Sequence, residues 1–228
     1  MNNYIEINNV SFSYINGKSI FKDFSLKLDC EETTILTGKN GSGKTTLSKL
    51  IVGVLKPQLG DIMILGESSK SMSLGRIGEL IGYVYQYPER QLFAQSVIDE
   101  LTFPLIFKGM DKEMVYAEAE EMIKLFELDK VKNSYPFFLS YGEKRRLAIA
   151  SVLMSKPKYL IMDEPTASLD HERIESLSLV LDMLKVKGVG VLIISHNKDF
   201  IENHGQRILH IEGGNVVNDI NCKGRSSS

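Results

Sequence analysis

The sequence predicts an α/β fold with a mostly parallel sheet core, an N-terminal antiparallel β subdomain and an inserted α-helical subdomain. Apolar runs at residues 33–37, 159–162 and 189–194 have the length and composition of buried parallel strands. Alternating apolar residues from Tyr4 to Leu28 are typical of an antiparallel sheet. Residues 89–156 carry a helical pattern instead.

The length of 228 residues suits one large domain with an inserted subdomain. We assign residues 1–88 and 157–222 to the catalytic core and residues 89–156 to the helical subdomain. The polar tail, residues 223–228, is expected to be disordered.

Composition excludes several classes of protein. The formal net charge of -2 provides no basic field, so we expect no nucleic-acid partner. The longest apolar runs are far shorter than the roughly 18 to 20 residues that span a bilayer, and residues 1–9 do not resemble a signal peptide. Cys30 and Cys222 are isolated, which indicates ordinary thiols. A cytoplasmic chain is expected.

The first predicted element is an antiparallel sheet at the edge of the fold, with a turn at Asn16-Gly17. Tyr14 lies just before that turn. Its ring can stack on a nucleotide base or simply pack on a strand face, and the pattern leaves both open.

The segment GKNGSGKTT, residues 38–46, is the strongest functional signal. It separates a predicted strand from a helix whose apolar residues recur at helical spacing as far as Val54. Glycines let successive N–H groups converge on phosphate at a helix N-terminus, which predicts a P-loop NTPase-type core. Lys44 is expected to reach the β- and γ-phosphates, and Thr45 to ligate Mg²⁺. The predicted nucleotide-binding residues of the loop are Gly38, Lys39, Asn40, Gly41, Ser42, Gly43, Lys44, Thr45 and Thr46.

Two further strands follow the glycine loop. Residues 61–65 are bracketed by glycines, and residues 68–78 are a loop or a short helix. A strand at residues 81–85 stops at Gln86. Gln86 is well placed to reach Mg²⁺ or an attacking water, although a glutamine in this setting is more often a surface residue.

The helical part contains two informative patterns. An apolar stripe predicts one helix through the residues Val115, Ala119, Met122 and Phe126. Ser140 and Glu143 fit a capping box, so a second helix should begin at Ser140 and end before Pro157. The N–H groups and the serine hydroxyl at that helix start can hold a phosphate.

The strand at residues 159–162 ends in Asp163-Glu164. Acidic residues after a strand are often turn formers or helix caps. Next to a phosphate loop, Asp163 would hold Mg²⁺, usually through its water, and Glu164 would orient or deprotonate the attacking water.

The C-terminal part continues the alternation of helix and strand. A helix is predicted after Ser168, Leu169 and Asp170, closed by Gly188, and residues 207–217 form a closing hairpin. The strand at 189–194 leads into His196. A lone histidine is more often structural, but the carboxyl edge of a parallel sheet is where ligands bind.

The order of these motifs resembles the ATP-binding cassette (ABC) ATPases over nearly the whole chain. Tyr14, GKNGSGKTT, Gln86, LSYGE, YLIMDEP, SLD and His196 correspond to the base-stacking aromatic, Walker A, Q-loop, signature, Walker B, D-loop and switch histidine. Within that superfamily, residues 85–103 resemble the ATPases of energy-coupling factor and cobalt-type importers. The matching residues are Gln86, Pro88, Gln91 and Phe93.

The resemblance implies a site shared by two chains. ATP would lie between Walker A of one subunit and the signature of a second ABC ATPase subunit, identical or different, so Ser140 and Gly142 would serve the partner's site. ATP closes such a dimer and hydrolysis opens it. The implied catalytic residues are Glu164 as general base, His196 at the γ-phosphate, Lys44 and Gln86, and the implied Mg²⁺ ligands are Thr45, Gln86 and Asp163.

Two residues depart from the common LSGGQ signature. Glu143 replaces the glutamine and is explained as the acid of the capping box. Tyr141 replaces a glycine, and a bulky ring there can restrict the approach of the opposing phosphate.

The leading hypothesis is a cytoplasmic ATPase subunit that drives a membrane importer for a vitamin or a transition-metal ion. It would sit on the inner face of the membrane through transmembrane partner subunits. The alternatives are the ATPase of another ABC importer class, a non-transport ABC ATPase of translation or DNA repair, and a degenerate regulatory cassette. Intact Lys44, Asp163, Glu164 and His196 argue against the degenerate cassette.

Overall fold

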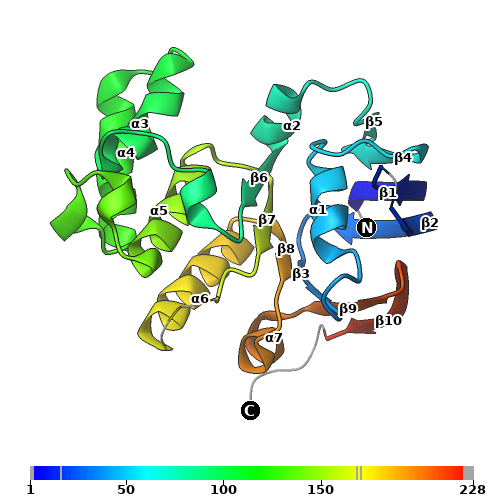
Figure 1. Cartoon of the computed structure of the whole chain (residues 1–228). Coiled ribbons are helices and arrows are strands. Elements are labelled where there is room, and N and C mark those ends of the chain that lie inside the picture. Colours follow the sequence, from blue (N-terminus) through cyan, green and yellow to red (C-terminus); the bar gives the residue numbers. More distant parts are fainter. Residues whose placement is uncertain (1–2, 16, 168, 170, 223–228) are drawn as a thin grey trace.

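Two β-sheets organise the chain in a computed structural model that describes residues 3–15, 17–167, 169 and 171–222 (Figure 1). The larger sheet has the strand order β10-β9-β3-β8-β7-β6, and the smaller sheet has the order β2-β1-β4-β5. The predicted α/β class is therefore confirmed. Asn16 of the predicted turn, Ser168, Asp170 and the tail at 223–228, for which we made predictions, lie outside the described residues.

The core of the larger sheet is parallel. Helices cover both of its faces, and its strands are therefore apolar on both sides. Every residue of β7 and β8 is buried. The predicted hairpin of β9 and β10 is confirmed, and β9 also pairs in parallel with β3. Its strands are β3 (Thr33–Thr37), β6 (Ile81–Val84), β7 (Tyr159–Asp163), β8 (Gly190–Ile194), β9 (Arg207–Glu212) and β10 (Asn215–Asn221).

The smaller sheet is antiparallel throughout, as the alternating N-terminal pattern predicts. Its inner face packs on helix α1 (Lys44–Ile51), because the buried Ile5, Ile7 and Leu28 share one hydrophobic cluster with Leu47 and Leu50 of that helix. Its strands are β1 (Asn3–Ser13), β2 (Ser19–Asp29), β4 (Leu59–Ile64) and β5 (Glu67–Ser68).

Three of the helices, α3, α4 and α5, lie between β6 and β7 in sequence, and Figure 1 shows them gathered on the side away from the antiparallel sheet. None of the described helices is both long and apolar enough to span a bilayer. The helices are α1 (Lys44–Ile51), α2 (Leu74–Leu80), α3 (Val97–Phe107), α4 (Lys112–Leu125), α5 (Tyr141–Met154), α6 (His171–Val186) and α7 (Lys198–His204).

Helix ends and faces differ from the sequence prediction at two places. Helix α1 ends at Ile51, before Gly53 adopts a φ of 75°, so Val54 lies outside the helix and is 54% exposed. In α4, Val115 and Ala119 are buried as predicted. Met122 is only partly buried, because its neighbour Ile123 takes the inward position.

We predict that Ile161→Ala lowers the free energy of unfolding by about 2 to 5 kcal/mol, because it leaves a cavity in the middle of β7. Ile161 is fully buried, whereas Val217 of β10 is 55% exposed. The matched control Val217→Ala should change the same free energy by about 0.5 kcal/mol or less. Urea denaturation of both variants measures the difference, and an equal loss in the two would contradict this account of the core.

Candidate functional site

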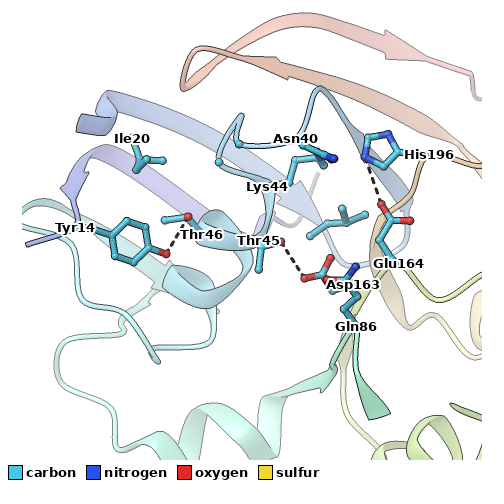
Figure 2. A pocket seen from close by; sticks show the side chains of 13 residues that line it. Tyr14, Ile20, Asn40, Lys44, Thr45, Thr46, Gln86, Asp163, Glu164 and His196 are labelled. Carbon is cyan, nitrogen blue, oxygen red and sulfur yellow. Dashed lines mark hydrogen bonds and ion pairs between the residues drawn. The ribbon is translucent and has the colours of Figure 1, made fainter. Parts of the chain in front are cut away.

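A cavity of about 450 Å³ lies at the carboxyl edge of the larger sheet (Figure 2). The residues that line it come from six separate parts of the chain, and only the folded sheet brings these parts together. The lining residues are Tyr14, Ile20, Asn40, Gly41, Gly43, Lys44, Thr45, Thr46, Gln86, Asp163, Glu164, Ile194 and His196.

Strand pairing explains why these residues meet. Ile194 at the end of β8 pairs with Leu36 of β3 on one side and with Asp163 of β7 on the other. Residues that follow these three parallel strands therefore emerge at one edge. That edge carries the glycine loop after β3, Glu164 after β7 and His196 after β8.

The glycine loop depends on backbone conformations that favour glycine. Gly38, Gly41 and Gly43 have φ angles of 142°, 79° and 107°. A Cβ atom on Gly38 would lie 2.2 Å from the carbonyl oxygen of Ile211, so a larger residue cannot fit there. Gly43 is the N-cap of α1 and offers no side chain to that helix, so the first N–H groups of α1 can bind an anion.

Lys44 lies within the loop and is buried, with only 7% of its surface exposed. Its ammonium donates hydrogen bonds to the carbonyl oxygens of Gly38 at 2.6 Å and Lys39 at 3.1 Å. Burial lowers the pKa of this ammonium, and the carboxylates of Glu164 and Asp163 oppose that shift. Lys44 is also the first residue of α1, so its cation can meet a phosphate bound by the first N–H groups of that helix.

Thr45 and Asp163 form a pair of oxygen groups suited to a hard cation. The Thr45 hydroxyl donates a hydrogen bond of 3.0 Å to the Asp163 carboxylate. Burial raises the pKa of the Asp163 carboxyl against the opposing effect of this hydrogen bond. Mg²⁺ prefers oxygen ligands, and Gln86 lines the same cavity, so the predicted Mg²⁺ ligands are compatible with the ion.

Glu164 has a strained backbone with a φ of 51°. Non-glycine residues adopt this left-handed conformation at a cost of about 1 to 2 kcal/mol, and such strain concentrates at functional sites. Its N–H donates to the carbonyl of Ile194 at 2.9 Å, and its carboxylate lies 3.5 Å from Nε2 of His196. Burial raises the pKa of the Glu164 carboxyl, although His196 opposes the shift.

Tyr14 lies at the cavity through its contact with α1. Its hydroxyl is 3.2 Å from the hydroxyl oxygen of Thr46, and its ring meets Phe12 edge to face. Tyr14 as a whole is still 44% exposed. This exposure leaves the ring available to a base, so stacking stays a prediction beside the simple packing on Phe12.

The structure does not bring every predicted residue to the cavity. Ser140 and Gly142 are at the start of α5 and are not among the lining residues. Ser140 instead forms the predicted capping box, in which its N–H donates to the Glu143 carboxylate at 2.8 Å. The exposed ammonium of Lys39 pairs with Glu212 at 3.3 Å, and the Ser42 hydroxyl is buried without a hydrogen-bond partner among the residues that the structure describes.

Arg145 is a residue of this region that sequence reasoning missed. It is fully buried, and its guanidinium donates to the carbonyl oxygens of Gln86 at 2.7 Å and Glu164 at 3.0 Å. The sequence does hold a signal that links Arg145 to Tyr141: Arg145 follows Tyr141 by four residues, so the two side chains share one face of the helix. Its targets are backbone carbonyls, which no side-chain pattern identifies.

Comparison with known proteins places this geometry in a family. The family model described as "ABC transporter" matches residues 21–167. An energy-coupling factor transporter ATP-binding protein, EcfA2 of Thermotoga maritima, is 37% identical over 221 residues, which cover 94% of this chain and 82% of the relative.

Two solved structures share the fold. The first is cbiO1 from Clostridium perfringens, part of the ABC transporter complex cbiONQ, with a TM-score of 0.84 and 28% identity over 98% of this chain and 90% of its own. The second is the dimeric ATP-binding cassette MJ0796 bound to ADP and Pi, with a TM-score of 0.87 and 27% identity over 96% of this chain and 99% of its own.

We predict that Lys44→Ala raises the dissociation constant for ATP by about tenfold or more, because it removes the buried ammonium beside the phosphate loop. Lys22→Ala removes an exposed cation of β2 outside the cavity and serves as the control, with an expected change within about twofold. Isothermal titration with ATP measures both. Equal affinities in the two variants would contradict the assignment of the loop as the phosphate site.

Proposed function

The chain belongs to the ABC transporter family and is one of its ATP-hydrolysing cassettes, and from that membership we propose that it energises a membrane importer of the energy-coupling factor type. The cargo would be a vitamin or a transition-metal ion. The observation that carries the proposal is the similarity to EcfA2 over 94% of this chain. The residues Gln86, Pro88, Gln91 and Phe93, which resemble that class, support it.

In the proposed mechanism, the phosphates of ATP bind the N–H groups at the start of α1. The Lys44 ammonium would then exchange its bonds to the loop carbonyls for the β- and γ-phosphates. The exposed ring of Tyr14 would stack on the base. Ser42 contributes a buried hydroxyl that has no hydrogen-bond partner in the described part of the chain, and a phosphate oxygen would satisfy it.

Glu164 is the proposed general base. It would accept the proton of the attacking water, and burial, which raises the pKa of this carboxyl, makes it a stronger base than an exposed glutamate. His196, 3.5 Å from that carboxylate, would orient it and contact the γ-phosphate. The hydroxyl of Thr45 and the carboxylate of Asp163, with Gln86, would hold Mg²⁺, which supplies positive charge that stabilises the transferring phosphoryl group.

The proposed assembly has two ATPase subunits and at least one transmembrane subunit, on the cytoplasmic face of the membrane. Ser140 and Gly142 would face the nucleotide of the second subunit, since they do not line the cavity of their own chain. Residues 89–156 would act as a helical subdomain that presents this signature to the second subunit. Gln86 would link the site to the transmembrane partner.

We expect affinity purification from detergent-solubilised membranes to recover this chain with a second ATPase and a transmembrane protein. The tag should be placed at the N-terminus, so that Ser140 and Gly142 at the start of α5 stay free to contact the second subunit. Identification of the recovered chains by mass spectrometry is the measurement. Recovery of only ribosomal or DNA-repair proteins would instead favour the non-transport class.

Glu164→Gln should abolish ATP turnover while ATP binding persists, because the amide keeps the size of the side chain but cannot accept the proton of water. We expect turnover by the reconstituted complex to fall about a hundredfold or more, with the ATP dissociation constant changed by less than about threefold. Glu121→Gln on the exposed face of α4 is the matched control. Near-wild-type turnover in the Glu164 variant would refute the assignment.

A further inference from the structure

Tyr141 lies at the first position of α5, and its side chain contacts its own chain. Its hydroxyl donates a hydrogen bond of 3.0 Å to the carbonyl oxygen of Gln86 and accepts one of 2.9 Å from Arg145. The Arg145 guanidinium also lies over the tyrosine ring, 5.4 Å from its centroid. From the sequence we expected this ring to restrict the approach of an opposing phosphate. That expectation was made without these contacts within the chain.

Arg145 connects the two loops that carry the catalytic side chains. One nitrogen of its guanidinium donates to Gln86, after β6, and another donates to Glu164, after β7. The side chain is fully buried and its hydrogen-bond acceptors here are neutral oxygens. Charge-assisted bonds of this kind in a buried setting are strong and directional. The guanidinium therefore fixes the relative position of two peptide groups.

The backbone of Glu164 is sensitive to such a contact. Its left-handed conformation is held by three hydrogen bonds, one from its N–H to the carbonyl of Ile194 and two to its own carbonyl, from Arg145 at 3.0 Å and from the N–H of Ala167 at 3.2 Å. Loss of the charge-assisted bond from Arg145 would leave this carbonyl with the longer bond from Ala167, so less would oppose relaxation of the peptide toward a commoner conformation. The carboxylate near His196 would then move with its backbone.

We propose that Tyr141 and Arg145 are positioning residues that hold Gln86 and Glu164 of their own chain and connect them to the start of α5. The inference rests on the proposed function, in which the start of α5 is the half-site offered to the second subunit. When the start of α5 shifts as it contacts the second subunit's nucleotide, Tyr141 and Arg145 transmit that shift to the general base of this chain. Tyr141 acts on its own subunit's ATP and not on the phosphate opposite it.

Mixed complexes with a single active site test this directly, using Tyr141→Phe, which keeps the ring and removes the hydroxyl. In the first arrangement this chain carries Tyr141→Phe, and the catalytic glutamate of the second ATPase subunit is replaced by glutamine. In the second arrangement this chain carries both Tyr141→Phe and Glu164→Gln, and the second subunit is intact. The second subunit is a differently tagged copy of this chain or the distinct ATPase that co-purifies with it.

We expect Tyr141→Phe to lower kcat about fivefold in the first arrangement, relative to the same complex with Tyr141. KM for ATP should stay within about twofold, because the phosphate loop is unaltered. In the second arrangement kcat should be unchanged. Tyr116→Phe on α4 is the control and should leave kcat unchanged in both.

Three results would overturn the inference: a fall in the second arrangement alone, an equal fall in both, or no fall in either. Thermal melting of the variant establishes that the fold is intact, since a structural defect would lower both arrangements equally. Turnover of the fully intact complex is measured first. Its absence would refute the proposed function and the inference together, whereas turnover with one of the three results would overturn the inference alone.

Discussion

The pairing of β8 with β3 on one side and β7 on the other is the constraint on which the site depends. It aligns Leu36, Asp163 and Ile194 in register. The phosphate loop, the acidic pair and His196 lie together because each is at, or just after, the end of one of these strands. A change of register by one residue would move each side chain of a strand to the opposite face of the sheet and separate these groups. The buried strands of the larger sheet thus determine the geometry of the cavity.

Local patterns were sufficient wherever one short segment decides its own conformation. The glycine loop needs positive φ angles at Gly38 and Gly43, and the sequence provides glycine there. The capping box of Ser140 and Glu143 is likewise complete within four residues. These features were predicted correctly because their partners are neighbours in the sequence.

Contacts between distant segments could not be predicted in the same way. The parallel pairing of β9 with β3 depends on packing between elements that are far apart in the sequence. The direction of the Tyr141 side chain depends on the carbonyl of Gln86, which is 55 residues away. A backbone carbonyl has no sequence signature, so the pattern showed an unusual tyrosine and left its partner unknown.

The central claim is that this chain carries half of each of two ATP sites. A structure of the assembled Glu164→Gln protein with Mg²⁺ and ATP tests it most directly. The account predicts that the Lys44 ammonium leaves the carbonyl of Gly38 for the phosphates and that the γ-phosphate also contacts Ser140 or Gly142 of a second subunit. A nucleotide enclosed by the residues of one chain alone, with Lys44 still bound to its own loop, would contradict it.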